Sequence, residues 1–157
     1  GTLMLFLVHI GWGKPVPVNP HNFRHPKRDE AKVAFAGPLS NLLTAMVFSV
    51  PFKYFADSPD FFVIFRLSQA LFSMSILLCV FNLLPFPPLD GSKIVGIFVP
   101  VKWHRAYHNY LADGVRYFFI FLVIDTFILG RYFGSSFLSY VIFSLSDFVA
   151  SLILFGT

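Results

Sequence analysis

Charged residues are scarce in this 157-residue chain, and cysteine is nearly absent. Asp, Glu, Lys and Arg together make up 13% of the sequence, about half of the 25% that is usual in a soluble domain. The single cysteine, Cys79, excludes a framework of disulfides within the chain. The chain opens on Gly1, and neither a basic region nor a cleavage site accompanies the first apolar stretch. We therefore expect no signal peptide here, and we expect the chain to be part of a longer protein.

Hydrophobic residues are abundant instead. They make up 56% of the sequence, including 22 Phe, and the mean hydropathy is +0.70. So much apolar sequence with so little charge is typical of an integral, multi-pass membrane protein, and we expect an all-α fold whose partner is the lipid bilayer. The net charge is +4, and the basic residues responsible lie beside the apolar stretches. This position indicates a role in membrane orientation rather than in binding to nucleic acid.

The apolar stretches predict a bundle of about four transmembrane helices. The expected spans are residues 33–55, 61–86, 115–129 and 137–155. Residues 3–12 are apolar but too few to cross a bilayer as a helix. Residues 94–110 mix apolar and basic side chains, and we expect them to lie at the membrane interface. The whole chain, residues 1–157, is interpreted as one partial domain with Pro-rich loops.

The distribution of Lys and Arg predicts the orientation in the membrane. Residues 14–32 and 91–110 are rich in basic side chains, whereas residues 53–60 and 130–136 are poor in them. Rich and poor loops alternate along the predicted spans, and the basic loops of membrane proteins face the cytoplasm. Asp90 is therefore expected near the cytoplasmic face.

The third apolar stretch ends in an unusual segment, Asn82-Leu-Leu-Pro-Phe-Pro-Pro-Leu-Asp-Gly91. Its prolines lack an N–H, and each ring clashes with the carbonyl four residues earlier. The carbonyls expected to lose their helical partners are those of Phe81, Leu83 and Leu84. Unwound backbone at membrane depth is tolerated only where protein buries it or water reaches it. The carboxylate of Asp90 follows directly, so we expect a reaction or ion site at this point.

Three strings taken together resemble the site-2 protease family of zinc metallopeptidases, which cleave substrates inside the membrane. They are Gly11-Trp-Gly-Lys-Pro-Val-Pro-Val-Asn-Pro20, Ala36-Gly-Pro-Leu-Ser-Asn41 and the Asn82–Gly91 segment. The resemblance implies that Asp90 is the third protein ligand of a zinc ion. The family's other two ligands are the histidines of a His-Glu-x-x-His helix, whose Glu acts on the attacking water. This chain contains no such string.

The resemblance therefore implies the C-terminal part of a protease core that lacks two zinc ligands and the general base. A fragment of this kind has no complete catalytic set, and we expect it to be inactive alone. The implied cofactor is zinc, the implied substrates are single-span membrane proteins, and the implied process is regulated intramembrane proteolysis by a zinc-activated water.

Four residues are candidates for substrate binding, namely Asn41, Asn82, Pro85 and Pro87. Asn82 has two interpretations, since its amide either caps carbonyls freed by the prolines or contacts the substrate backbone. Asn41 either holds helices together or touches substrate. An amide has enough donors and acceptors for both roles at once.

Several other ionisable residues invite a functional interpretation. The pairs His21/His25 and His104/His108 have helical i, i+4 spacing but lack the Glu, and we do not expect either to bind the zinc. His9 is expected to be a packed or capping residue. Asp125 and Asp147 lie inside predicted spans, where carboxylates are rare. We expect them to pair with a nearby cation, such as Arg131 for Asp125, or to line the bundle interior.

Two further functions remain open from the sequence. One is a catalytically silent membrane module that binds transmembrane segments through the same groove. The other is an ion or proton transporter that uses Asp90, Asp125 and Asp147. An intramembrane aspartyl protease is less favoured, because no second motif with a paired catalytic Asp accompanies Asp90.

Overall fold

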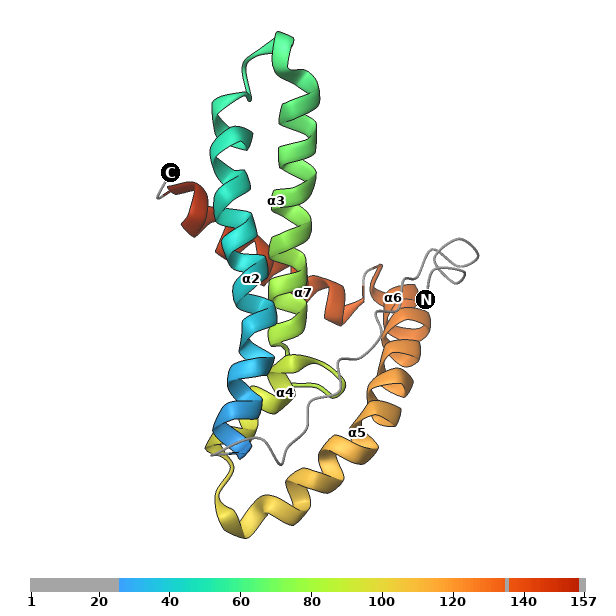
Figure 1. Cartoon of the computed structure of the whole chain (residues 1–157). Coiled ribbons are helices and arrows are strands. Elements are labelled where there is room, and N and C mark those ends of the chain that lie inside the picture. The colour runs from blue at the N-terminus through green and yellow to red at the C-terminus, as the bar shows by residue number, and fades with distance from the viewer. Residues whose placement is uncertain (1–25, 135, 156–157) are drawn as a thin grey trace, which may run out of the picture.

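The computed structural model describes residues 26–134 and 136–155, and these form helices and turns with no strand among them. Two long helices, α2 (Pro26–Tyr54) and α3 (Phe62–Leu83), run antiparallel as a hairpin (Figure 1). A 3₁₀ turn, Pro59–Phe61, precedes α3. In α2, Asp29 lies in the first turn and Lys53 in the last, which matches the sign of the helix dipole at each end.

A short helix and a long one follow the hairpin. The helix α4 (Asp90–Val95) lies against α2 and α3. Two 3₁₀ turns, Gly96–Phe98 and Val101–Trp103, lead into α5 (His104–Ile124). Much of α5 lies apart from the hairpin (Figure 1), so the space between them is bridged by α4 and by the Pro-rich segment before it.

The C-terminal part returns across the hairpin. A π-helical turn, Asp125–Leu129, continues α5 and leads into α6 (Gly130–Phe133). Gly134 ends α6 with φ of 77°, a left-handed conformation that glycine adopts without a steric penalty. The last helix, α7 (Phe137–Phe155), then packs on α3 and α2.

The core lies between these helices, and it is small beside the apolar surface. Ala45 of α2, Phe72 and Ile76 of α3, Phe118 of α5 and Ile142 of α7 belong to one buried cluster. The buried face of α2 carries small residues, Ala31, Ala34, Pro38, Ala45 and Ser49. Small side chains let neighbouring helices approach closely, as in membrane helix packing.

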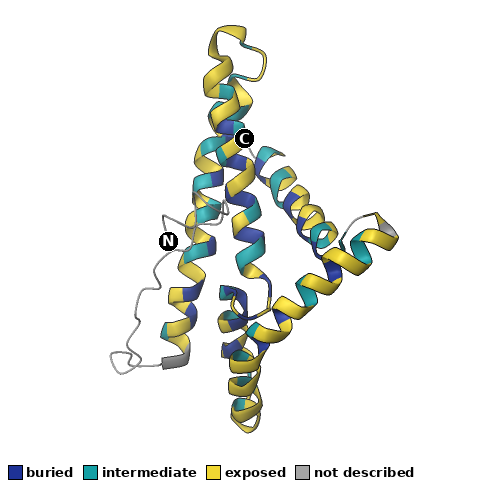
Figure 2. Cartoon of the chain, turned by 90° about the vertical axis from the view of Figure 1, so that its right-hand side faces the viewer, coloured by how far each residue is buried: buried dark blue, intermediate teal, exposed yellow. Residues whose placement is uncertain are grey.

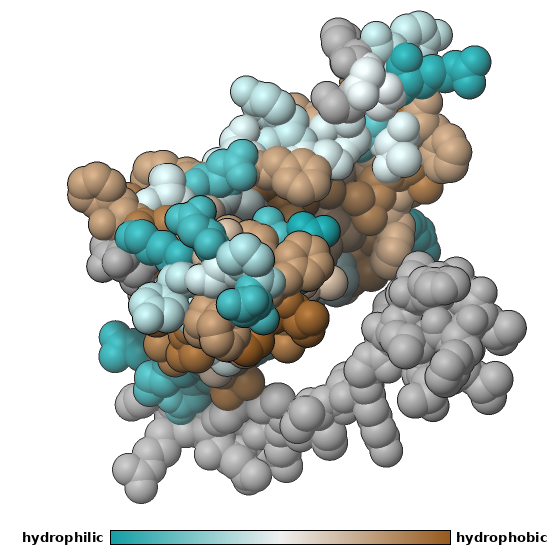
Figure 3. Space-filling model, turned by 90° about the horizontal axis from the view of Figure 1, so that it is seen from above, coloured by the Kyte–Doolittle hydropathy of each residue, from teal (hydrophilic) through white to brown (hydrophobic). Residues whose placement is uncertain are grey.

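The outer faces of the helices are mostly exposed and strongly apolar. Figure 2 shows exposed residues along the outer surface of every long helix, and Val47, Val63 and Phe148 are examples with large exposed side chains. In the view onto the end where α2 and α3 join, hydrophilic residues lie among hydrophobic ones (Figure 3). An apolar exterior of this extent suits contact with lipid rather than water.

Within the described part of the chain, three helices are long and apolar enough to cross a membrane, and they confirm the expectation of an all-α membrane protein. They comprise Arg28–Tyr54, Pro59–Leu83 and Phe137–Phe155. The expected fourth span, 115–129, falls on the end of α5 and the π-helical turn. Neither element is among the three, so the fourth span stays a prediction. Residues 3–12, the string Gly11–Pro20, His9 and the pair His21/His25 lie outside the described residues.

Candidate functional site

The Pro-rich segment unwinds where the sequence predicts it. The helix α3 ends at Leu83, and Leu84 has extended backbone angles. The carbonyl of Phe81 loses its helical donor four residues on, because that residue is Pro85, and it accepts the N–H of Leu84 at 3.1 Å instead. The carbonyl oxygens of Leu83 and Leu84 lie so close to Gly91 that a side chain there would overlap both. The segment thus folds back on the end of α3, and only glycine fits at the contact.

Side chains of α5 hold the same segment from the other side. The hydroxyl of Tyr110 donates to the carbonyl of Pro85, and the hydroxyl of Tyr107 donates to the carbonyl of Ser92 at 2.9 Å. Pro87 is buried against Gly114, where an added methyl group would lie 2.7 Å from the Pro87 ring. Freed or terminal carbonyls thereby gain donors, which backbone removed from water requires. The unwound segment is consequently fixed by α5 rather than left loose.

The two tyrosines lie outside the three apolar helices; Tyr107 is half-buried, and Tyr110 is 40% exposed. Burial raises the pKa of Tyr107, and the negative charge of Glu30 on α2 raises it further. Burial also raises the pKa of Tyr110. Both phenols therefore remain protonated donors across the physiological pH range.

Asp90 begins α4 and lies against α2. A methyl group added at Gly37 would lie 3.2 Å from Oδ2 of Asp90, so the carboxylate rests on the one position of the 36–41 string that has no side chain. Two of the three strings that carry the family resemblance therefore meet in space. The carboxylate is half-buried, and within the described residues it makes no hydrogen bond or ion pair, which leaves its oxygens available for a ligand.

The candidate substrate-binding residues lie on α2, in the last turn of α3 and in the Pro-rich segment. Asn41 lies one helical turn beyond Gly37 on the same side of α2, and Asn82 lies in the last turn of α3. Both amides are half-buried, and neither makes a hydrogen bond within the described part of the chain. Pro85 is exposed and Pro87 is buried. The structure thus brings Asn41 and Asp90 toward the same region of α2, while the roles of the four residues stay predictions.

The described residues contain no cluster of side chains that could hold a metal ion together with Asp90. No group of three or more His, Cys, Asp or Glu side chains comes together within residues 28–134 and 136–155. His104 and His108 lie in the first turns of α5, and the His108 ring packs on that of Tyr107. A catalytic zinc needs three protein ligands, so the described residues do not form a complete zinc site by themselves.

Asp125 has a structural role that the sequence did not reveal. Its side chain is 1% exposed, and its two oxygens accept the N–H groups of Phe137 at 2.8 Å and Leu138 at 3.0 Å. The expected pairing with Arg131 is not formed. The carboxylate instead satisfies the free donors at the start of α7, and it ties α7 to the end of α5. A short-range sequence signal could not have found this contact, because it spans the turn between two helices.

A family comparison and two relatives agree with these observations. The model of peptidase family M50 matches residues 54–124. A protein of Bacillus subtilis, YwhC, named as a candidate zinc metalloprotease, is 32% identical over 138 residues, which is 84% of this chain and 62% of the relative. A candidate zinc metalloprotease of Methanocaldococcus jannaschii, MJ0611, is 33% identical over 76 residues, which is 48% of this chain and 35% of the relative.

The chain thus spans less than two thirds of the length of either relative. No solved structure matches it. The family match covers the whole Asn82–Gly91 segment, including Asp90. The match to peptidase family M50 and the two relatives thus support the site-2 protease family that the three strings resemble.

Proposed function

We propose that this chain is part of an intramembrane zinc endopeptidase and that Asp90 is one of three protein ligands of its zinc. The observation that carries the proposal is the contact between Asp90 and Gly37. It brings the 36–41 string and the Asn82–Gly91 segment together, at the point where the prolines interrupt the helical backbone after α3. The carboxylate there has no hydrogen bond or ion pair within the described residues, so it is available to a metal.

The residues of this chain would have different roles around the metal. When bound, zinc supplies an acidified water for attack on a peptide bond. Asp90 contributes a negative ligand, while the other two ligands and the general base come from a His-Glu-x-x-His helix that this chain does not contain. Tyr107, Tyr110 and Gly114 keep the Pro-rich segment in place, which fixes the position of Asp90.

The substrate is proposed to be a single-span membrane protein whose helix is locally opened. The amides of Asn41 and Asn82 would hydrogen-bond its extended backbone, because both are half-buried and make no hydrogen bond within the described chain. Pro85 and Pro87 would shape the entry, since a segment without N–H donors cannot pair with its own helix. Regulated intramembrane proteolysis is the corresponding process.

Asp90 is proposed to lie near the cytoplasmic face, where water can reach it. The start of α2, which carries Arg28, the helix α4, which carries Lys93, and the 3₁₀ turn Val101–Trp103, which carries Lys102, lie toward the same end of the molecule (Figure 1). The α2–α3 turn with Asp57 and Asp60 lies at the opposite end. This polarity supports a basic cytoplasmic side.

A silent binding module is the second candidate, because the chain itself has one ligand and no general base. A transporter receives less support. Asp125, one of its three proposed carboxylates, is occupied by the N–H groups of Phe137 and Leu138.

The test uses the complete protein in liposomes with a single-span reporter. We expect cleavage that a zinc chelator stops and that added zinc restores, while the isolated 157-residue chain retains no stoichiometric zinc and cuts nothing. Cleavage that persists after zinc removal would contradict the proposal. A complete protein that binds the reporter but never cuts it would favour the silent module.

A further inference from the structure

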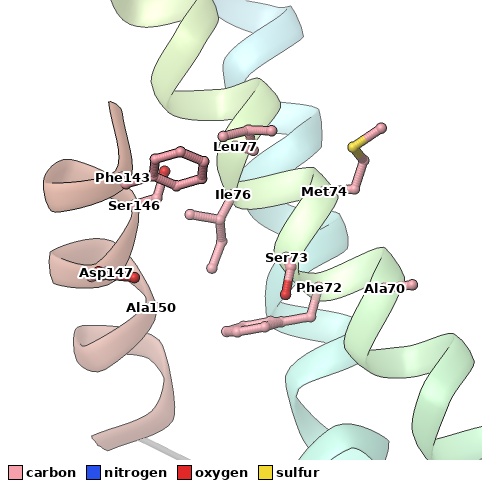
Figure 4. A pocket seen from close by; sticks show the side chains of 10 residues that line it. All are labelled: Ala70, Phe72, Ser73, Met74, Ile76, Leu77, Phe143, Ser146, Asp147 and Ala150. Carbon is pink, nitrogen blue, oxygen red and sulfur yellow. The ribbon is translucent and has the colours of Figure 1, made fainter. Parts of the chain in front are cut away.

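A second polar site lies in the membrane-spanning part, well separated along the chain from Asp90. A cavity of about 420 Å³ opens between α3 and α7. Figure 4 shows Ser73 of α3 and Ser146 and Asp147 of α7 among its walls, together with apolar side chains such as Phe72 and Ile76. The cavity therefore places a carboxylate and two hydroxyls in otherwise apolar surroundings.

Two of these polar groups have no partner in the described chain. The Oγ atom of Ser146 is buried and makes no hydrogen bond, and the residue is 9% exposed. Asp147, at the rim of the cavity, is exposed and makes no hydrogen bond or ion pair with any described residue. A buried hydroxyl without a partner is uncommon in folded proteins, and a carboxylate near the middle of a membrane-spanning helix is costly. Together they indicate that the cavity receives a ligand with hydrogen-bond donors.

The walls favour another helix as this ligand. Ala70, Ser73, Ser146 and Ala150 are small and lie on both sides of the cavity, and small residues allow a further helix to approach. A metal ion would find one carboxylate and two hydroxyls here, fewer oxygens than hard cations take. A lipid chain would leave the carboxylate unpaired.

The charge of the site selects the kind of helix. The carboxylate of Asp147 would be stabilised by a cation or a strong hydrogen-bond donor. None of the three apolar helices carries a Lys or Arg near its middle. Arg66 lies in the first turns of α3, and the basic residues of α2 lie near its two ends. Arg66 is one helical turn from Ala70 of the cavity wall, but its guanidinium donates to Gln69 at 3.1 Å rather than to Asp147, so this carboxylate is open to a cation from a partner.

We propose that the cavity between α3 and α7 is a docking site for a membrane-spanning helix of another protein that carries a Lys or Arg near its middle. Its cation pairs with Asp147, and its donors also reach the hydroxyl of Ser146. The docking is independent of the zinc site, because the cavity shares no residue with the Asp90 region. This assigns a partner-binding surface beyond the proposed proteolysis.

The experiment measures energy transfer in liposomes between the labelled complete protein and labelled model helices. The probes are two 21-residue Leu/Ala helices, one with a central Lys and one without. We expect the Lys helix to associate at least about fivefold more tightly, within the range measured for polar contacts between membrane helices. Asp147→Asn should remove this preference, and Ser146→Ala should reduce it about twofold.

Two control variants separate this site from the others. Asp57→Asn removes an exposed loop carboxylate, and Asp90→Asn removes the proposed zinc ligand, so both should keep the preference for the Lys helix. Equal association of the two probes with the wild-type protein would overturn the proposal, as would a preference that survives Asp147→Asn. Self-association that Asp147→Asn abolishes, without preference for the Lys helix, would assign the cavity to a second copy and would equally overturn it.

Discussion

Asp90→Asn is expected to abolish cleavage of a single-span reporter by the complete protein while leaving its insertion in the membrane unchanged. The amide keeps the shape of the side chain but lacks the negative charge, so the zinc loses an anionic ligand. Removal of a group that only supports a ligand typically costs 10–100-fold, and loss of the ligand itself should cost more than about 100-fold. Initial cleavage rates at equal protein content provide the measurement.

Asp125→Asn is the matched control for this variant. Its carboxylate binds the N–H groups at the start of α7 and lies outside the proposed site. An amide has one acceptor oxygen in place of two, so we expect a loss of about 1–3 kcal/mol in stability but substantial cleavage by the folded protein. Equal cleavage by Asp90→Asn and the wild type would show that Asp90 is merely the start of a helix.

Gly91→Ala is expected to have the second-largest effect. The added methyl group would overlap the carbonyl oxygens of Leu83 and Leu84, which belong to the backbone and cannot turn aside. Either the Pro-rich segment or α4 must move, and overpacking of this kind costs about 1–3 kcal/mol. Asp90 is the adjacent residue, and a displacement of about 1 Å near a reacting group can cost 100-fold in rate. Cleavage should therefore fall by about 100-fold or more.

Gly130→Ala provides the comparison for Gly91→Ala. Its added methyl group would lie 3.6 Å from the nearest atom, the carbonyl oxygen of Asp125, which is an ordinary contact. We expect its cleavage rate and thermal unfolding to stay close to those of the wild type. Wild-type cleavage by Gly91→Ala would mean that the close approach to α3 does not position Asp90.

Local sequence signals predicted the helices and the break between them. The prolines after Leu83 end α3 for a reason that lies within a few residues, namely missing N–H groups and ring clashes. The apolar stretches that form α2, α3 and α7 are likewise recognised from their own residues, without information from the rest of the chain. The helix α2 begins at Pro26, before the start of the predicted span at residue 33. Proline is well suited to a first helical turn, and the polar residues that follow extend the helix beyond its apolar part.

Contacts between distant segments could not be predicted in this way. Gly37 and Asp90 belong to different helices, and their approach depends on how α4 packs against α2. The capping of α7 by Asp125 likewise depends on the turn geometry after α5. In both cases the residue type suggested a role, but the partner was set by tertiary packing.

The most direct test of the central claim is zinc K-edge absorption spectroscopy on the complete protein with Asp90→Cys. If Asp90 binds the zinc, the replacement offers sulfur in place of oxygen, and the spectrum should gain a zinc–sulfur distance of about 2.3 Å that the wild type lacks. Cys79→Ser in both samples removes the chain's own cysteine as a source of sulfur. Bound zinc with the same oxygen and nitrogen shell in both samples would contradict the assignment of Asp90 as a ligand.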